Sequence, residues 1–270
     1  MKLRANTLIG GGLVALLALV ALLAAAWTPF DPLQVNVRLR LQPPSAAHWF
    51  GTDEFGRDVT SRIMAGAAAS ALVALLTVLL AVSLGTVFGA FTGFMRGWTD
   101  RAVMAVNDAL LAFPGILLAL AIMAITGPNK WGIVIALGLA YAPSVVRVVR
   151  GAVISIREKE YIEASRMIGN GELYTMARHV LPNVVSPIVV LATSMFGWVL
   201  LSESALSFLG LGVPPPAPTW GNMLAASRPF MDSAPWLSIV PGACIALTLL
   251  GVNLLGDSLR DRLDPRMANR

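Results

Sequence analysis

Few side chains in this sequence have the chemistry of a metal site or a disulfide. The chain of 270 residues contains two histidines, His48 and His179, and a single cysteine, Cys244. A structural zinc site needs four ligands, most often cysteine and histidine, and a disulfide needs a second cysteine. We therefore predict no metal site of nitrogen and sulfur ligands. His179 is expected at a helix end, near the terminal carbonyls.

The lysines exclude a phosphate-binding loop of the Walker type. Such a loop needs a glycine followed directly by lysine and then serine or threonine, so that backbone amides and the ammonium group can hold phosphates. The three lysines are Lys2, Lys130 and Lys159, and none of them follows a glycine. We predict that the chain is not an enzyme and binds no cofactor, and that any ATPase must be a separate polypeptide.

A short acidic segment contains Asp53, Glu54 and Asp58. Calcium loops of the EF-hand type need a regular series of oxygen ligands, which Phe55 and Arg57 interrupt here. The pattern favours a structural turn in which Arg57 pairs with a carboxylate. A contact surface for a partner protein is the alternative.

The composition requires lipid as the solvent of most of the chain. Hydrophobic residues make up 56% of it and charged residues 13%, against about 45–50% and 25% in soluble domains. A helix needs about 20 mostly apolar residues to cross a membrane. Six stretches come close, so we predict an all-α membrane protein with six transmembrane helices, and the first stretch is read as a retained helix rather than a signal peptide. The stretches are residues 7–27, 65–94, 102–125, 131–149, 184–201 and 237–255.

The distribution of positive charge predicts the orientation. Loops on the cytoplasmic side carry an excess of Lys and Arg. If the N-terminus is cytoplasmic, fourteen of the 20 Lys and Arg residues fall on the cytoplasmic side, with Arg147 at the end of the fourth stretch counted among them. Both termini and the connection 150–183 are then cytoplasmic. Because the charges flank apolar stretches, they predict contact with membrane lipid and not with nucleic acid.

The apolar stretches contain polar residues, prolines and glycines whose presence there needs a structural explanation. Charged groups at the centre of a membrane helix cost about 2.5–3.5 kcal/mol on insertion scales, so Asp108, Glu203 and Asn253 are candidates either for hydrogen bonds between helices or for the lining of a translocation path. Prolines permit kinks within three spans, and glycines at four-residue spacing predict close helix packing. These residues are Pro114, Pro143 and Pro241, and Gly85, Gly89 and Gly93.

The cytoplasmic connection predicts two short amphipathic helices. Gly169-Asn170-Gly171 should end the first helix, and Pro182 should end the second. Such a pair can insert into a groove of a partner protein or lie in the membrane interface, and periodicity alone leaves both open. The expected faces are Tyr161, Ala164, Ser165 and Ile168 in the first helix, and Leu173, Met176, Ala177 and Val180 in the second.

The same connection resembles a known family motif. Glu163-Ala164-Ser165, then Gly169 after three residues, then Leu181-Pro182, resembles the EAA loop of binding-protein-dependent ABC importer permeases, with departures at Ser165 and His179. Other stretches are similar to the dipeptide and oligopeptide branch of that family, and within it to the second of two paired permeases. They are residues 48–58, 207–216, 220–221 and 256–266.

The resemblance implies a passive subunit that another protein drives. It implies import of dipeptides or oligopeptides across the bacterial inner membrane, together with a homologous permease, a solute-binding protein and two ATPases that use ATP and Mg²⁺. It divides the chain into an N-terminal region at 1–66, a permease domain at 67–257 and a cytoplasmic tail at 258–270. The residues expected to couple to the ATPase are Glu163, Ala164, Ser165, Gly169, Leu181 and Pro182.

Two alternatives remain at this stage. A nickel importer shares the signatures of this branch and differs only in cargo. An ion-gradient carrier would be a different class, for which an internal repeat and paired charges at mid-membrane are expected. The sequence shows neither of these two features clearly.

Overall fold

The computed structural model describes the backbone of residues 2–263 and the side chains of residues 5–261. Within this part the chain is helical, and the only strand-like pairing is an isolated bridge between Thr52 and Asp58. This confirms the predicted all-α class. The helices are α1 (Lys2–Ala26), α2 (Val59–Met95), α3 (Gly97–Leu111), α4 (Gly115–Thr126), α5 (Lys130–Arg157), α6 (Glu160–Met167), α7 (Glu172–Thr175), α8 (Leu181–Phe208), α9 (Trp220–Ser227) and α10 (Trp236–Leu263).

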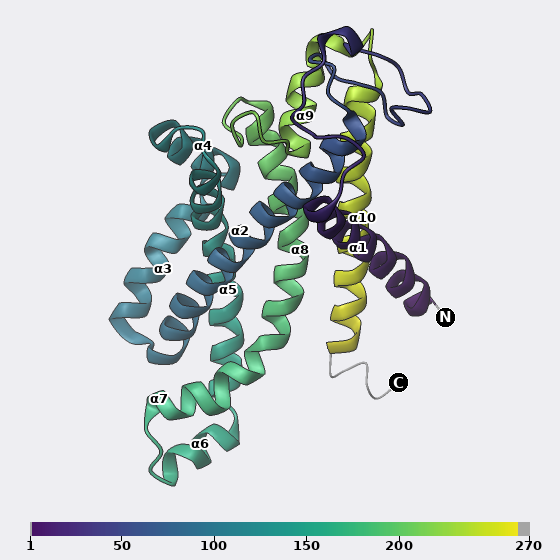
Figure 1. Cartoon of the computed structure of the whole chain (residues 1–270). Coiled ribbons are helices and arrows are strands. Elements are labelled where there is room, and N and C mark those ends of the chain that lie inside the picture. The colour runs from purple at the N-terminus through teal and green to yellow at the C-terminus, as the bar shows by residue number, and fades with distance from the viewer. Residues whose placement is uncertain (1, 264–270) are drawn as a thin grey trace.

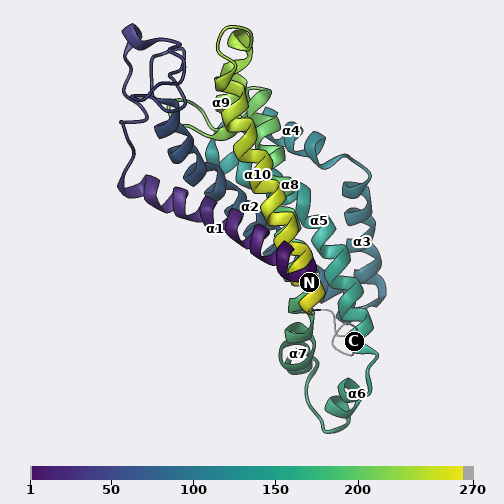
Figure 2. The same cartoon turned by 90° about the vertical axis from the view of Figure 1, so that its right-hand side faces the viewer.

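The molecule is an elongated bundle with different structures at its two ends (Figure 1). Residues 28–58 and α9 cover one end, and α6 and α7 project from the other (Figures 1 and 2). The last turns of α10 lie toward the same end as α6. The predicted tail at 258–270 is described only as far as residue 263.

The third predicted span is not one straight helix. Among the residues that the structure describes, five helices are long and apolar enough to cross a membrane, whereas α3 and α4 meet at an angle of 89°. The expectation of a continuous helix over 102–125 is therefore wrong. Pro114 lacks an N–H group and disfavours helical geometry at Phe113, which explains why the helix breaks here. Pro143 and Pro241, in contrast, lie inside the continuous helices α5 and α10.

Helices α2 and α5 run parallel and in close contact, as the order of the contacts made by the α2 glycines shows. A Cβ atom added to Gly85 would lie 2.3 Å from Cβ of Val145, and one added to Gly93 would lie 3.0 Å from Cβ of Val153. The predicted glycine stripe is therefore a packing surface, where two backbones approach closely. Since α2 and α5 point the same way, α3 and α4 together carry the chain back across the bundle. The bent pair thus counts as one crossing, which makes six.

Helix α1 crosses the side of α10 at a steep angle (Figure 1). A Cβ atom on Gly10 would meet the Leu255 backbone at 2.7 Å, and one on Gly251 would meet Cβ of Leu13 at 2.7 Å. The two helices are therefore antiparallel and touch through glycines. The opposite side of α1 exposes leucines, including Leu16, Leu19 and Leu22, as expected of a lipid-facing helix.

Pro182 begins a helix and does not end one. Helix α7, a π-helical turn at Met176–Val180 and α8 follow one another without interruption, so residues 172–208 form one helical stretch. Pro182 stands just after the π-helical turn, where the regular backbone hydrogen bonds are already interrupted, so its missing N–H is tolerated. A π-helical turn replaces the regular α-helical hydrogen bonds locally with wider ones. The connection between α5 and α8 is thus helically continuous, from residue 172 on, with the span that follows it.

Candidate functional site: the α6–α7 hook and the polar groups of α3 and α5

The hook, defined as residues 158–180, connects α5 to α8 and reverses direction between α6 and α7 (Figure 2). Gly169 has φ +91°, a conformation that other residues rarely adopt. The amide of Asn170 donates to the carbonyl of Ser165 at 3.2 Å, which closes the end of α6. Glu160 and Glu163 stand in the first turn of α6, where acidic groups complement the helix dipole.

The hook presents an exposed apolar surface. Tyr161 and Ala164 are exposed, and Ile168 is 81% exposed. Met167 and Leu173 are similarly accessible. Exposed side chains of this size in one small element indicate a protein or membrane contact. Glu163 lies exposed beside this surface.

Ser165 does not belong to that surface, although its spacing placed it there. It is 5% exposed and faces the inside of the hook, as Ile162 does. Its hydroxyl lies 3.1 Å from the hydroxyl of the buried Thr175 and accepts from the side-chain amide of Asn170 at 3.1 Å. Ser165 therefore joins α6 to α7. The correction follows from tertiary contact, because α7 folds back onto the face of α6 that carries Ser165.

A second connection reinforces the hook and attaches it to the bundle. Arg166 pairs with Glu172 at 3.1 Å across the bend. The guanidinium groups of Arg166 and Arg157 also lie 5.6 and 5.5 Å from the ring centre of Phe94, and Arg157 donates to the Phe94 carbonyl. Phe94 is buried at the end of α2. Phe94 is not among the predicted site residues, and its only signal in the sequence is its place at the end of a glycine-lined span.

The remaining motif residues lie where the hook enters α8. Leu181 packs against the core, and Pro182 is exposed. The ring of His179 meets that of Tyr174 edge to face at 6.0 Å. The carbonyl of His179 accepts from the side chain of Asn183 at 2.7 Å. His179 thus lies in the π-helical turn that precedes α8.

The polar groups inside the spans have different surroundings. Asp108 pairs with Arg147 of α5 at 2.7 Å, and both side chains are more than half exposed. Glu203 is fully buried, and its Oε1 accepts from the Ser207 hydroxyl at 2.9 Å within the same helix. Asn253 is exposed in the second half of α10. The structure therefore does not bring these three candidates together.

A second ion pair joins α3 to α5 nearer the hook. Arg150 donates to both carboxylate oxygens of Asp100, each at 2.7 Å. Parallel double hydrogen bonds of this kind fix orientation as well as distance. Neither residue stood out in the sequence, because the two lie 50 positions apart.

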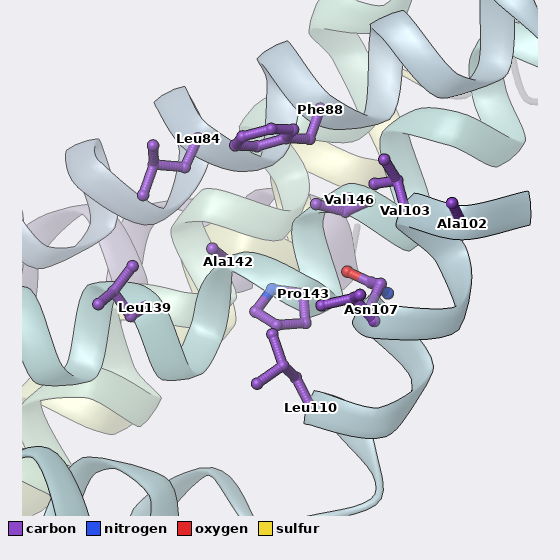
Figure 3. A pocket seen from close by; sticks show the side chains of 11 residues that line it. Leu84, Phe88, Ala102, Val103, Asn107, Leu110, Leu139, Ala142, Pro143 and Val146 are labelled. Atoms are coloured by element: carbon purple, nitrogen blue, oxygen red, sulfur yellow. The ribbon is translucent and has the colours of Figure 1, made fainter. Parts of the chain in front are cut away.

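A cavity of about 430 Å³ lies between α2, α3 and α5 (Figure 3). Its lining is almost entirely apolar, with Leu84, Phe88 and Pro143 among the residues around it. Asn107 is the polar exception. It is buried, and its Nδ2 has no hydrogen-bond partner among the described residues.

Comparison with known proteins decides the family. The family described as "Binding-protein-dependent transport system inner membrane component" matches residues 85–269, which is more than half of the chain. The chain belongs to this family. It is therefore a multi-pass permease subunit of an ABC importer of the inner membrane, as the EAA-like motif indicated.

Individual relatives match nearly the whole chain. The dipeptide transport system permease protein DppC of Alkalihalophilus pseudofirmus is 44% identical over 98% of this chain and 88% of that protein. The di/tripeptide permease DppC of Pseudomonas aeruginosa is 41% identical, over 97% and 88% respectively. The glutathione permease GsiD of Pectobacterium atrosepticum is 41% identical, over 98% and 89%.

Solved structures support the fold. The MetNI methionine ABC transporter in an inward-facing conformation superimposes with a TM-score of 0.61 at 16% identity, covering 73% of this chain and 94% of that chain. An amino acid ABC transporter with histidines gives 0.51 at 17% identity, covering 71% and 91%. The shared architecture is that of an importer's transmembrane subunit.

Proposed function

We propose that this chain is one of two homologous permeases that together conduct short peptides into the cytoplasm. A solute-binding protein delivers the peptide at the end covered by residues 28–58 and α9. Two separate ATPases bind at the opposite end and use ATP and Mg²⁺. The chain itself supplies no hydrolytic chemistry. The observation that carries the proposal is the hook, which is exposed on its outer face and held together on its inner face.

The hook has the properties of a mechanical coupling element. Its apolar residues and Ala164 permit close docking, while Glu163 offers a directional contact to the ATPase. Its inner hydrogen bonds prevent α6 from moving independently of α7. Force applied to α6 therefore passes through the continuous helix into α8, and through Phe94 into α2.

Peptides are the proposed cargo because the relatives reported above are named for dipeptides, di/tripeptides and glutathione. None of these three names favours the nickel alternative. Uptake of a radiolabelled dipeptide by proteoliposomes that contain the whole complex tests this choice. Uptake of ⁶³Ni²⁺ without peptide uptake would contradict it.

The docking role can be tested at the bend of the hook. Gly169→Val forces a β-branched residue into a positive φ, whereas Gly171→Val places the same residue at φ −64°. We expect Gly169→Val to reduce copurification of the ATPases and peptide transport at least tenfold, and Gly171→Val to retain most of both. If no ATPase copurifies with the unmodified chain, the proposed function is wrong.

A further inference from the structure

The Asp108–Arg147 ion pair lies in the part of α5 that a hydrocarbon core centred on this helix covers. Helix α5 has 28 residues and a length of about 42 Å, so a hydrocarbon core of about 30 Å covers roughly residues 134–153. On α3, the exposed Trp98 is suited to the membrane interface. Asp108 lies ten residues further on, about 15 Å along the helix. Both partners are thus at similar depth from the hook side.

Lipid chains cannot solvate the charges of this pair. The Asp108 and Arg147 side chains are 57% and 59% exposed in the isolated chain, so pairing covers less than half of each. An arginine can reach an interface with its long stem, but the short aspartate side chain cannot. Ionisable groups at such depth normally face a bundle interior or a water-filled cavity.

Several exposed residues near the pair are small or polar, although the larger Val106 of α3 and Val148 of α5 are exposed as well. Gly151 and Ser155 follow Arg147 at four-residue intervals and are exposed, so they share its face of α5. Ala105 and Ala112 share the face of Asp108 on α3 and are exposed as well. We call these residues, together with the pair, the α3–α5 face.

Other exposed faces of the bundle have the opposite character. Helix α2 exposes Leu72, Leu75 and Leu79, and α10 exposes Leu247 and Leu250. Large apolar side chains of this kind are compatible with lipid. Lipid can cover these leucine-rich surfaces more readily than it can cover the charged pair.

We propose that the α3–α5 face lines the cytoplasmic half of the translocation pathway, where Asp108 and Arg147 meet the charged ends of the peptide. The pair offers one negative and one positive group, which match the ammonium and carboxylate of a zwitterionic peptide. The small neighbours leave room for cargo that varies in its side chains. This inference rests on the proposed function for the identity of the cargo, but the water exposure of the face does not depend on it.

Accessibility of single cysteines tests the position of the face. In the whole complex, with Cys244→Ser as background, Gly151→Cys and Ala105→Cys should react with a membrane-impermeant maleimide at least tenfold faster than Leu75→Cys and Leu247→Cys. Saturating dipeptide should slow the first two at least threefold. Asn253→Cys, the competing polar position on α10, should show no protection by peptide.

The results separate the possible failures. If Gly151→Cys and Ala105→Cys react as slowly as the leucine controls, the face packs dry against lipid or the partner permease and the inference is wrong. If they react fast but dipeptide gives no protection, the role in contacting cargo is wrong. Labelling needs no ATP hydrolysis, so it tests the position of the face even if the complex fails to transport peptide.

Charge restoration tests the role of Asp108 separately. Asp108→Cys should lower peptide transport at least fivefold. Modification with an anionic methanethiosulfonate should recover transport at least threefold more than modification with a cationic one. Equal recovery with both reagents contradicts a role for the negative charge. Fluorescence-detected gel filtration of each variant identifies losses that arise from misassembly.

Discussion

At the scale of single residues, Asp53 anchors the end of the bundle opposite the hook. Its carboxylate accepts from Nε of Arg57 at 2.7 Å and lies 3.3 Å from Nε of Arg62. All three residues are buried. The predicted pairing of Arg57 with a carboxylate is confirmed, and the partner of Arg62 is added. Burial also raises the pKa of the neighbouring Glu54 carboxyl, and the charge of Asp53 adds to that rise.

Removal of the Asp53 charge should therefore be costly. Asp53→Asn leaves two buried guanidinium groups without their shared carboxylate, and breaking a buried pair typically costs about 3–5 kcal/mol. Thermal unfolding of the purified complex should show a clear fall in Tm. The control is Glu54→Gln, whose ion pair with Arg57 is longer at 3.5 Å and whose loss should lower the Tm less. Equal effects would rule out Asp53 as the anchor.

Ser165 is a second residue whose role can be measured directly. Ser165→Ala removes the hydroxyl that joins Thr175 and Asn170. A lost hydrogen bond costs about 1 kcal/mol, which is roughly a fivefold change in an opening equilibrium. Hydrogen exchange of amides in residues 160–175 should accelerate by about that factor. Ser155→Ala, at an exposed position on α5, should leave the exchange of these amides unchanged.

At the scale of elements, the close contact between α2 and α5 organises the bundle. A Cβ atom on Gly89 would lie 2.7 Å from the carbonyl oxygen of Val146, so the neighbour in the way is backbone and cannot rotate aside. The two parallel helices then require α3 and α4 to return the chain. The ion pairs of Asp100 with Arg150 and of Asp108 with Arg147 hold α3 against α5 where the chain crosses back.

Substitution of Gly89 should separate these two helices. Gly89→Leu overpacks the interface, and overpacking costs about 1–3 kcal/mol or more. The yield of monodisperse complex and its Tm should both fall. Gly12→Leu is the matched control, because nothing lies within 4 Å of a Cβ at that exposed position of α1. A similar loss in both variants would show that added bulk, and not the α2–α5 contact, is responsible.

At the scale of the whole molecule, six crossings return the chain to its starting side. The parallel arrangement of α2 and α5 makes the bent α3–α4 pair a crossing rather than a re-entrant loop. With the charge bias of the loops, this predicts that both chain ends and the hook are cytoplasmic.

Reporter fusions test this topology. A green fluorescent protein at the C-terminus should fluoresce, and alkaline phosphatase inserted after the exposed Ser45 should be active. Phosphatase inserted at Asn170 should be inactive, since that position is cytoplasmic in the proposed orientation. If α3 and α4 formed a re-entrant loop, the hook and the C-terminus would lie on the other side of the membrane. The green fluorescent protein at the C-terminus would then not fluoresce, and the phosphatase at Asn170 would be active.

The sequence by itself determined the membrane class, the six crossings and the position of the hook. These properties depend on local composition and on a contiguous motif, which can be recognised without partners. Only the tertiary structure decided that α3 and α4 bend by 89°, that Ser165 faces inward and that Phe94 receives two arginines. It also paired Asp108 with Arg147, 39 positions away. Such contacts depend on how separate helices meet, and the periodicity of one helix carries no information about which partner its faces will find.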